Sequence, residues 1–114
     1  MNAPMNCQLI GEWRIVEADL WDRAFLDLSG PAKLLIKSDG YGEIAFGAMQ
    51  ATLYLEYGRS TVFFTWDGFD EMDDVRGSGS AELADDGSLE IEFEYHLGDE
   101  ATFKARRASF SAAC

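Results

Sequence analysis

The stretch SLEIEFEYHLGDEATFKARR, residues 88–107, decides the fold. Apolar residues alternate with charged or polar ones over two short runs, which are separated by a turn centred on Gly98. A period of two residues places one set of side chains on one face of a β-sheet and the other set on the opposite face. We therefore expect an antiparallel hairpin with an apolar inner face, in a register that places Phe93 opposite Phe103.

The same alternation recurs through the rest of the chain and is interrupted by turns that contain Gly or Asp. Residues 19–28 have the only spacing compatible with a helical turn, and the following Gly30-Pro31 ends it. Eight successive runs predict an all-β fold, an eight-stranded antiparallel up-and-down barrel with a short helical segment between strands 1 and 2. The predicted strands are 10–18, 32–37, 42–47, 50–57, 61–66, 75–83, 88–96 and 100–107.

Length and composition indicate one domain. The chain has 114 residues, of which 47% are hydrophobic and 13% aromatic, enough to form a core without disulfides or metals. We expect a single β-barrel domain over 10–107, a flexible N-terminal segment over 1–9 and a flexible C-terminal tail over 108–114. The cysteines, Cys7 and Cys114, flank the barrel and are expected to be free thiols.

The net charge of −12 argues against partners that carry many phosphates. Nucleic acids and anionic lipid surfaces need Lys and Arg for neutralisation, so we expect no nucleic-acid and no membrane partner. The start of the chain lacks a positively charged segment and an apolar run, and no stretch reaches the length of a membrane span. These features predict a cytoplasmic protein.

The sequence has few residues that could perform catalysis. His96 is the sole histidine, and no phosphate-binding glycine motif, CxxC or G-x-S-x-G motif is present. The acidic stretch 67–74, predicted to be a loop, lacks the ligand spacing of a calcium-binding loop. Glu17 and His96 are the one acid/base pair that could be considered. We expect no cofactor, no metal and no enzyme activity.

An even number of strands brings both termini to one end of the barrel. The opposite end then collects the connections predicted to be longer, which are 19–30, 47–50, 67–74 and 97–99. Binding residues concentrate on such loops and in barrel mouths. The residues that alternation and position direct toward this mouth are Glu17, Trp21, Gln50, Trp66 and Tyr95, and those on its rim are His96, Asp67 and Asp70.

Glu17 is the most informative of these residues because it falls on the same predicted face as Trp13 and Ile15. A carboxylate on an apolar face must be hydrogen-bonded, paired, solvated or protonated. It is either a polar anchor in an apolar pocket or a rim carboxylate in water. Trp66 and Tyr95 likewise could be ligand platforms or core residues.

Gly11-Glu12-Trp13 on the first strand and Arg106-Arg107 on the last resemble the signature of calycins, the lipocalin, fatty-acid-binding and avidin-type barrels. The resemblance implies that Trp13 closes one end of the barrel and packs against a basic residue of the last strand. Alternation selects Arg107 for this contact because it is in phase with Phe103 and Ala105. A guanidinium stacked on an indole contributes on the order of 1–2 kcal/mol.

Further motifs are similar to those of a bacterial family of small proteins that carries no known activity. They are Gly11-Glu12-Trp13-Arg14-Ile15, Trp21-Asp22, Gly30-Pro31, Trp66-Asp67-Gly68-Phe69-Asp70-Glu71 and His96-Leu97-Gly98-Asp99. The likeness covers nearly the whole chain. It supports the fold and leaves the function open.

The sequence thus favours a small acidic calycin-like barrel that binds a small apolar or weakly cationic ligand at the long-loop end. The alternative is a protein-interaction or homo-oligomeric module with a filled barrel and no ligand. Phe63 and Tyr54 alternate onto the outer side of their strands, where they would suit the contact of a homodimer.

Overall fold

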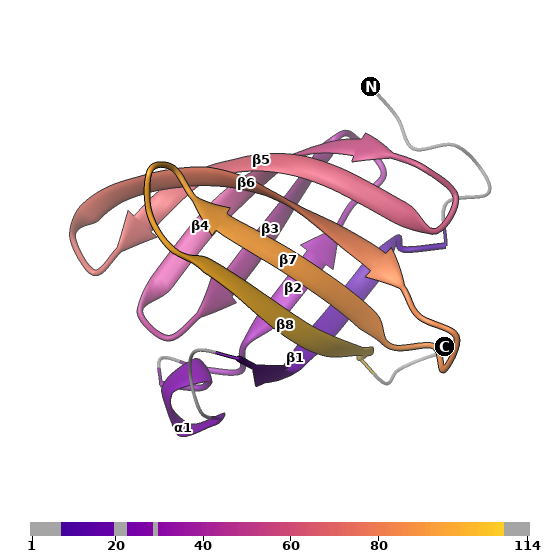
Figure 1. Cartoon of the computed structure of the whole chain (residues 1–114), viewed down its shortest axis with the longest axis horizontal. Helices are drawn as coiled ribbons and strands as arrows, with labels where there is room; N and C mark the ends of the chain where they lie inside the picture. The colour runs from indigo at the N-terminus through magenta and orange to yellow at the C-terminus, as the bar shows by residue number, and fades with distance from the viewer. Residues whose placement is uncertain (1–7, 20–22, 29, 109–114) are drawn as a thin grey trace.

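The computed structural model describes residues 8–19, 23–28 and 30–108. Eight strands pair antiparallel in chain order, and pairing of the first with the last closes the barrel (Figure 1). The predicted architecture is confirmed, including the short helix between the first two strands. The elements are β1 Gly11–Ala18, α1 Arg23–Leu26, β2 Lys33–Ile36, β3 Tyr41–Phe46, β4 Met49–Tyr57, β5 Thr61–Asp70, β6 Asp73–Leu83, β7 Leu89–Tyr95 and β8 Glu100–Arg107.

Alternation along each strand fills the barrel with apolar side chains. Phe93 on β7 is fully buried and lies at the centre of a group of aromatic rings. Its ring stacks on Trp66 at a centroid distance of 4.4 Å and meets Phe46 edge-on at 5.6 Å. The ring of Phe103 lies 5.8 Å away. Such aromatic pairs add specific geometry to the hydrophobic effect that drives burial.

The end of the barrel where β1 begins and β8 ends is closed by Trp13. The Arg107 guanidinium lies 4.1 Å from the centroid of the Trp13 ring, so the predicted contact is confirmed. Arg107 also donates hydrogen bonds to the carbonyl oxygens of Ile10, at 2.8 Å, and Gln8, at 2.7 Å. The indole nitrogen of Trp13 donates to the carbonyl of Leu9, whose side chain is fully buried. These contacts hold the first strand against the last.

The acidic stretch 67–74, predicted to be a loop, is a β-hairpin. β5 and β6 remain paired up to Asp70 and Asp73, and Glu71, with a φ of 63°, begins the tight turn between them. The hairpin reaches beyond its neighbours at the left of Figure 1. β5 stays paired with β4 as far as Asp70, whereas β6 has no pairing with β7 before Gly77, so residues 73–76 need not follow the apolar alternation of the core. Asp67, Asp73 and Asp74 are exposed, so their carboxylates stay in water. The prediction failed for that reason.

In the hairpin of β7 and β8, the predicted residues face the core, but the two strands pair in a different register. Ile91, not Phe93, lies opposite Phe103, a shift of two residues. The turn is centred on Leu97, which has a φ of 57°, and the Tyr95 amide donates to the Asp99 carbonyl at 2.9 Å. An even shift keeps inner residues opposite inner residues, so burial alone did not select between the two registers.

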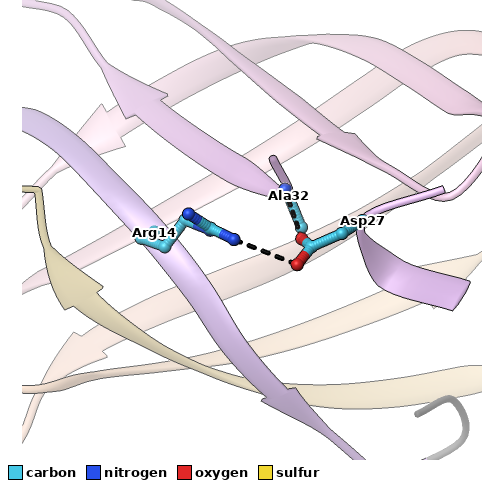
Figure 2. Close-up of polar contacts among 3 residues, drawn as sticks. All are labelled: Arg14, Asp27 and Ala32. Atoms are coloured by element: carbon cyan, nitrogen blue, oxygen red, sulfur yellow. Dashed lines mark hydrogen bonds and ion pairs between the residues drawn. The ribbon is translucent and has the colours of Figure 1, made fainter. Parts of the chain in front are cut away.

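The β1–β2 connection is fastened to the outside of the barrel by Asp27, just after α1. One carboxylate oxygen accepts from Arg14 Nη2 at 3.0 Å, and the other accepts from the Ala32 amide at 3.0 Å (Figure 2). One side chain thereby ties β1, the end of α1 and the approach to β2 together. In the described part of the chain, no helical segment meets the length and hydropathy that a bilayer-spanning helix needs.

Candidate functional site

The rim opposite the start of β1 is not the ring of long loops that the sequence predicted. The β3–β4 and β5–β6 connections are two-residue turns at 47–48 and 71–72, and the β7–β8 connection covers only 96–99. The β1–β2 connection, from 19 to 32, is the exception. Short turns follow the strand direction and cannot fold over the barrel end, so this rim offers little to enclose a ligand.

The interior at this rim is occupied by aromatic side chains. Trp66 is buried between the stacked Phe93 ring and the edge of Tyr95, whose centroid lies 5.2 Å away. Burial raises the pKa of Tyr95 to about 12, and the nearby carboxylates of Asp70 and Asp99 add to the shift. An eight-stranded barrel has an interior that side chains can fill. Trp66 and Tyr95 therefore pack the core here.

Glu17 does not point into the barrel. The pairing of β1 with β8 shifts between Ile15 and Glu17, so Val16 is the extra residue of a β-bulge. A bulge reverses the alternation beyond it, and Glu17 is exposed opposite Lys104. The predicted inward position is wrong because alternation read along one strand does not reveal a bulge.

Gln50 also lies outside the barrel. It is exposed on β4, while its neighbours Met49 and Ala51 are buried on the inner face. Its placement at the mouth was wrong because the β3–β4 turn is tight and leaves no loop to fold inward. Trp21, also predicted to face the mouth, lies outside the described residues, as do Cys7 and Cys114.

Three predicted residues border one groove of about 510 Å³ that crosses β5, β6 and the β7–β8 turn. They are Tyr95, His96 and Trp66, although the Trp66 side chain itself is buried in the core. His96 is exposed, and its amide donates to the Arg76 carbonyl at 2.8 Å. Arg76 lies opposite Asp67 and also lines the groove. Sequence reasoning missed Arg76 because the register of β5 with β6 was hidden in the supposed loop.

A wall of exposed aromatic residues adjoins this groove. Tyr41, Tyr54 and Phe63, on β3, β4 and β5, keep 49%, 41% and 60% of their surface exposed, and we call them the aromatic wall. Tyr41 and Tyr54 are opposite each other, with ring centroids 5.9 Å apart in an edge-to-face arrangement. The Tyr54 hydroxyl donates to Asp67 at 3.1 Å, and this hydrogen bond raises the pKa of Tyr54.

Small side chains lie beside the aromatic wall. Thr65 is opposite Ser78, and Phe63 is opposite Ser80, so β6 presents hydroxyl groups where β3–β5 present rings. A second groove, of about 380 Å³, shares Tyr54 and Thr65 with the first. The outer face of β3–β6 thus combines a protruding ring, Phe63, with shallow depressions on both sides of the Tyr54–Thr65 pair.

The described residues offer no arrangement for metal chemistry, since their His, Cys, Asp and Glu side chains do not gather in groups of three or more suited to an ion. Comparison of the chain with protein-family models, with curated proteins and with solved structures gives no match. The geometry of the outer face is therefore the basis for a functional proposal.

Proposed function

We propose that the protein is an interaction module that self-associates through the aromatic wall. The observation that carries this proposal is the cross-strand group of exposed aromatic rings, Tyr41, Tyr54 and Phe63, on a chain with a net charge of −12. Tyrosine and phenylalanine are enriched in the buried centres of protein interfaces, where charged residues are depleted. An exposed group of this kind is a candidate contact surface.

The relief of this face suits a second copy of the same chain. In a two-fold contact the same patch serves both partners, so each protruding group needs a matching depression on the same surface. Phe63 protrudes beside the grooves that Thr65 and Ser78 help to line. A two-fold axis near the Tyr54–Thr65 pair would allow each Phe63 ring to approach the small side chains of the other copy.

The closed barrel restricts how two copies can meet. Because β1 pairs with β8, the sheet has no free strand edge for addition of another strand. Contact must therefore use an outer face or an end. The aromatic wall can bury aromatic surface in such a contact. The outer face of β7 is less suited to it, because glutamates occupy its outer positions at 90, 92 and 94 and would repel those of a second copy.

Substitution of Phe63 tests the proposal. Phe63→Asp is expected to weaken self-association about 30-fold, the effect of losing an interface residue worth ~2 kcal/mol. Sedimentation equilibrium over a range of concentrations measures the dissociation constant. Phe69→Asp is the matched control, because Phe69 lies on the same strand with 58% exposure against 60% for Phe63. A monomer at all concentrations, or equal weakening by both variants, contradicts the proposal.

Ionic strength provides a second readout of the same experiment. Each chain carries a net charge of −12, so two copies repel each other at long range. Raising salt from about 0.05 M to about 0.5 M shortens the Debye length several-fold and removes most of this repulsion. Self-association should therefore strengthen with salt. Weakening with salt would indicate a contact held by opposite charges instead of the aromatic wall.

A second candidate is binding of a small, weakly cationic ligand in the groove at Tyr95 and His96. The acidic side chains of Asp67 and Glu94, which line this groove, favour it. Mass spectrometry of the purified protein under gentle ionisation should then show an added mass that Glu94→Gln reduces. The chain mass alone, with and without an added amine such as benzylamine, contradicts this candidate.

A further inference from the structure

Three cations lie in a row across neighbouring strands on the outside of the barrel. Arg14 on β1 is opposite Arg106 on β8 and opposite Lys33 on β2. Lys33 and Arg106 are exposed, and the Arg14 side chain keeps 43% of its surface in solvent. We call these three residues the cationic row. The chain has only nine Lys and Arg residues and a net charge of −12, so the row is a marked departure from its overall charge.

Like charges placed directly opposite each other across strands destabilise a sheet. Asp27 offsets this for Arg14, with a 3.0 Å ion pair (Figure 2). Lys33 and Arg106 make no ion pair with any residue that the structure describes. Lys104 shows the contrasting arrangement two residues from Arg106 on β8. It lies between Glu17 and Glu90 and reaches Asp86 at 4.0 Å.

The cationic row lines one side of a groove of about 670 Å³ between β8, β1, β2 and the start of β4. The other side has the apolar side chains of Pro31 and Ala45, and Glu12 also lines the groove. Gln50, exposed beside Met49, supplies an amide within the same groove. Positive charge on one side and apolar surface on the other match a ligand that has both characters.

Arg14 carries an unmet hydrogen-bond donor at this site. Its Nε is shielded from solvent and has no acceptor among the described residues. A buried donor without an acceptor costs free energy. Arg14 Nη2 bonds to Asp27 at 3.0 Å, and the strand registers place this arginine beside Lys33 and Arg106. Asp27 thereby restrains the guanidinium, and Nη1, which makes no hydrogen bond with a described residue, is left for an acceptor in the groove.

We propose that this groove binds an amphipathic organic anion, with a carboxylate or phosphate monoester at the cationic row and an apolar group against Pro31 and Ala45. Arg106 and Lys33 bind the anion directly, and Arg14 contributes a guanidinium positioned by Asp27. Oxyanions with charged donors form the stronger class of hydrogen bond. The site lies on a different part of the barrel from the aromatic wall, so it does not depend on self-association.

Nuclear magnetic resonance titration of the isotope-labelled protein tests the proposal. Phenyl phosphate and benzoate are the two anionic probes, and benzyl alcohol is the neutral control with the same ring. At least one anionic probe should shift the amide signals of Lys33, Gln50 and Arg106 saturably, and benzyl alcohol should bind at least tenfold more weakly. The stronger of the two anions then identifies phosphate or carboxylate as the preferred group.

Matched variants separate the site from the overall charge. Lys33→Gln with Arg106→Gln should weaken probe binding about 100-fold, about tenfold for each cation that is neutralised. Lys104→Gln removes the same charge two residues from Arg106 on the same face of β8 and should leave binding unchanged. The single variants replace the double variant if it fails to fold. Absence of saturable binding, equal binding of benzyl alcohol, or equal weakening by Lys104→Gln overturns the proposal.

Discussion

Replacing Phe93 with alanine is expected to lower the free energy of unfolding by about 3–5 kcal/mol. The side chain is fully buried, and its ring contacts those of Phe46, Trp66 and Phe103. Removal of the ring loses the transfer free energy of its buried atoms. It also leaves a cavity among aromatic neighbours that cannot all move toward one another.

Urea unfolding followed by tryptophan fluorescence and circular dichroism measures this loss. Phe69→Ala is the control, because Phe69 is 58% exposed and its truncation should change stability by less than ~0.5 kcal/mol. Comparable losses in the two variants would mean that the ring group around Phe93 is not the centre of the core. A large ligand-sized cavity beside Phe93 would give the same result, since truncation would then create little new void.

Gly77→Ala is expected to cost about 3 kcal/mol, the upper part of the range for an overpacked core. A Cβ at this position would lie 1.8 Å from the Glu94 carbonyl oxygen and 2.8 Å from Trp66 Cζ2. The first contact is with backbone of the neighbouring strand, so β6 and β7 would have to move apart. Glycine within a strand often marks such a close approach.

Ser78→Ala is the control for Gly77→Ala. Ser78 is the next residue on β6, and it faces outward with a Cβ already present. We expect its substitution to cost less than ~0.5 kcal/mol. Thermal unfolding compares the two variants, and hydrogen exchange should be faster at the β6–β7 amides of Gly77→Ala alone. Wild-type stability for Gly77→Ala would show that the two strands are farther apart than the structure places them.

Alternation was sufficient to predict the architecture because burial enforces it over most of the barrel. Phe93 and Phe103 were assigned to the inner face, and both are buried. The choice of Arg107 over Arg106 as the partner of Trp13 followed from the same phase, and the guanidinium lies over that indole. A two-residue period specifies a face wherever one side of a strand is covered by the core.

The sequence was insufficient where backbone geometry departs from that period. The bulge at Val16 turned Glu17 outward, and the positive φ of Leu97 displaced the last turn by one residue. Neither residue type signals such a conformation, because glycine and asparagine are the usual candidates for positive φ. Both features depend on how β8 pairs with its neighbours, which no local pattern encodes.

The candidate surfaces were predicted in part. Alternation placed Tyr54 and Phe63 outside, and both are exposed on the aromatic wall. Tyr41 was missed because the third strand was predicted to begin at residue 42, whereas β3 begins at Tyr41 and pairs it with Tyr54. The cationic row likewise needs the registers of β1 with β2 and β8, which bring together residues that are distant in the chain.

The seam between the first and last strands has a consequence for synthesis on the ribosome. The bonds from Arg107 to Ile10 and Gln8 join residues 97 and 99 positions apart. While the nascent polypeptide lacks β8, one edge of β1 has no hydrogen-bonding partner and the apolar interior stays open to water. The barrel therefore cannot close until β8 has left the ribosome. Until then the exposed apolar surface can bind chaperones or aggregate.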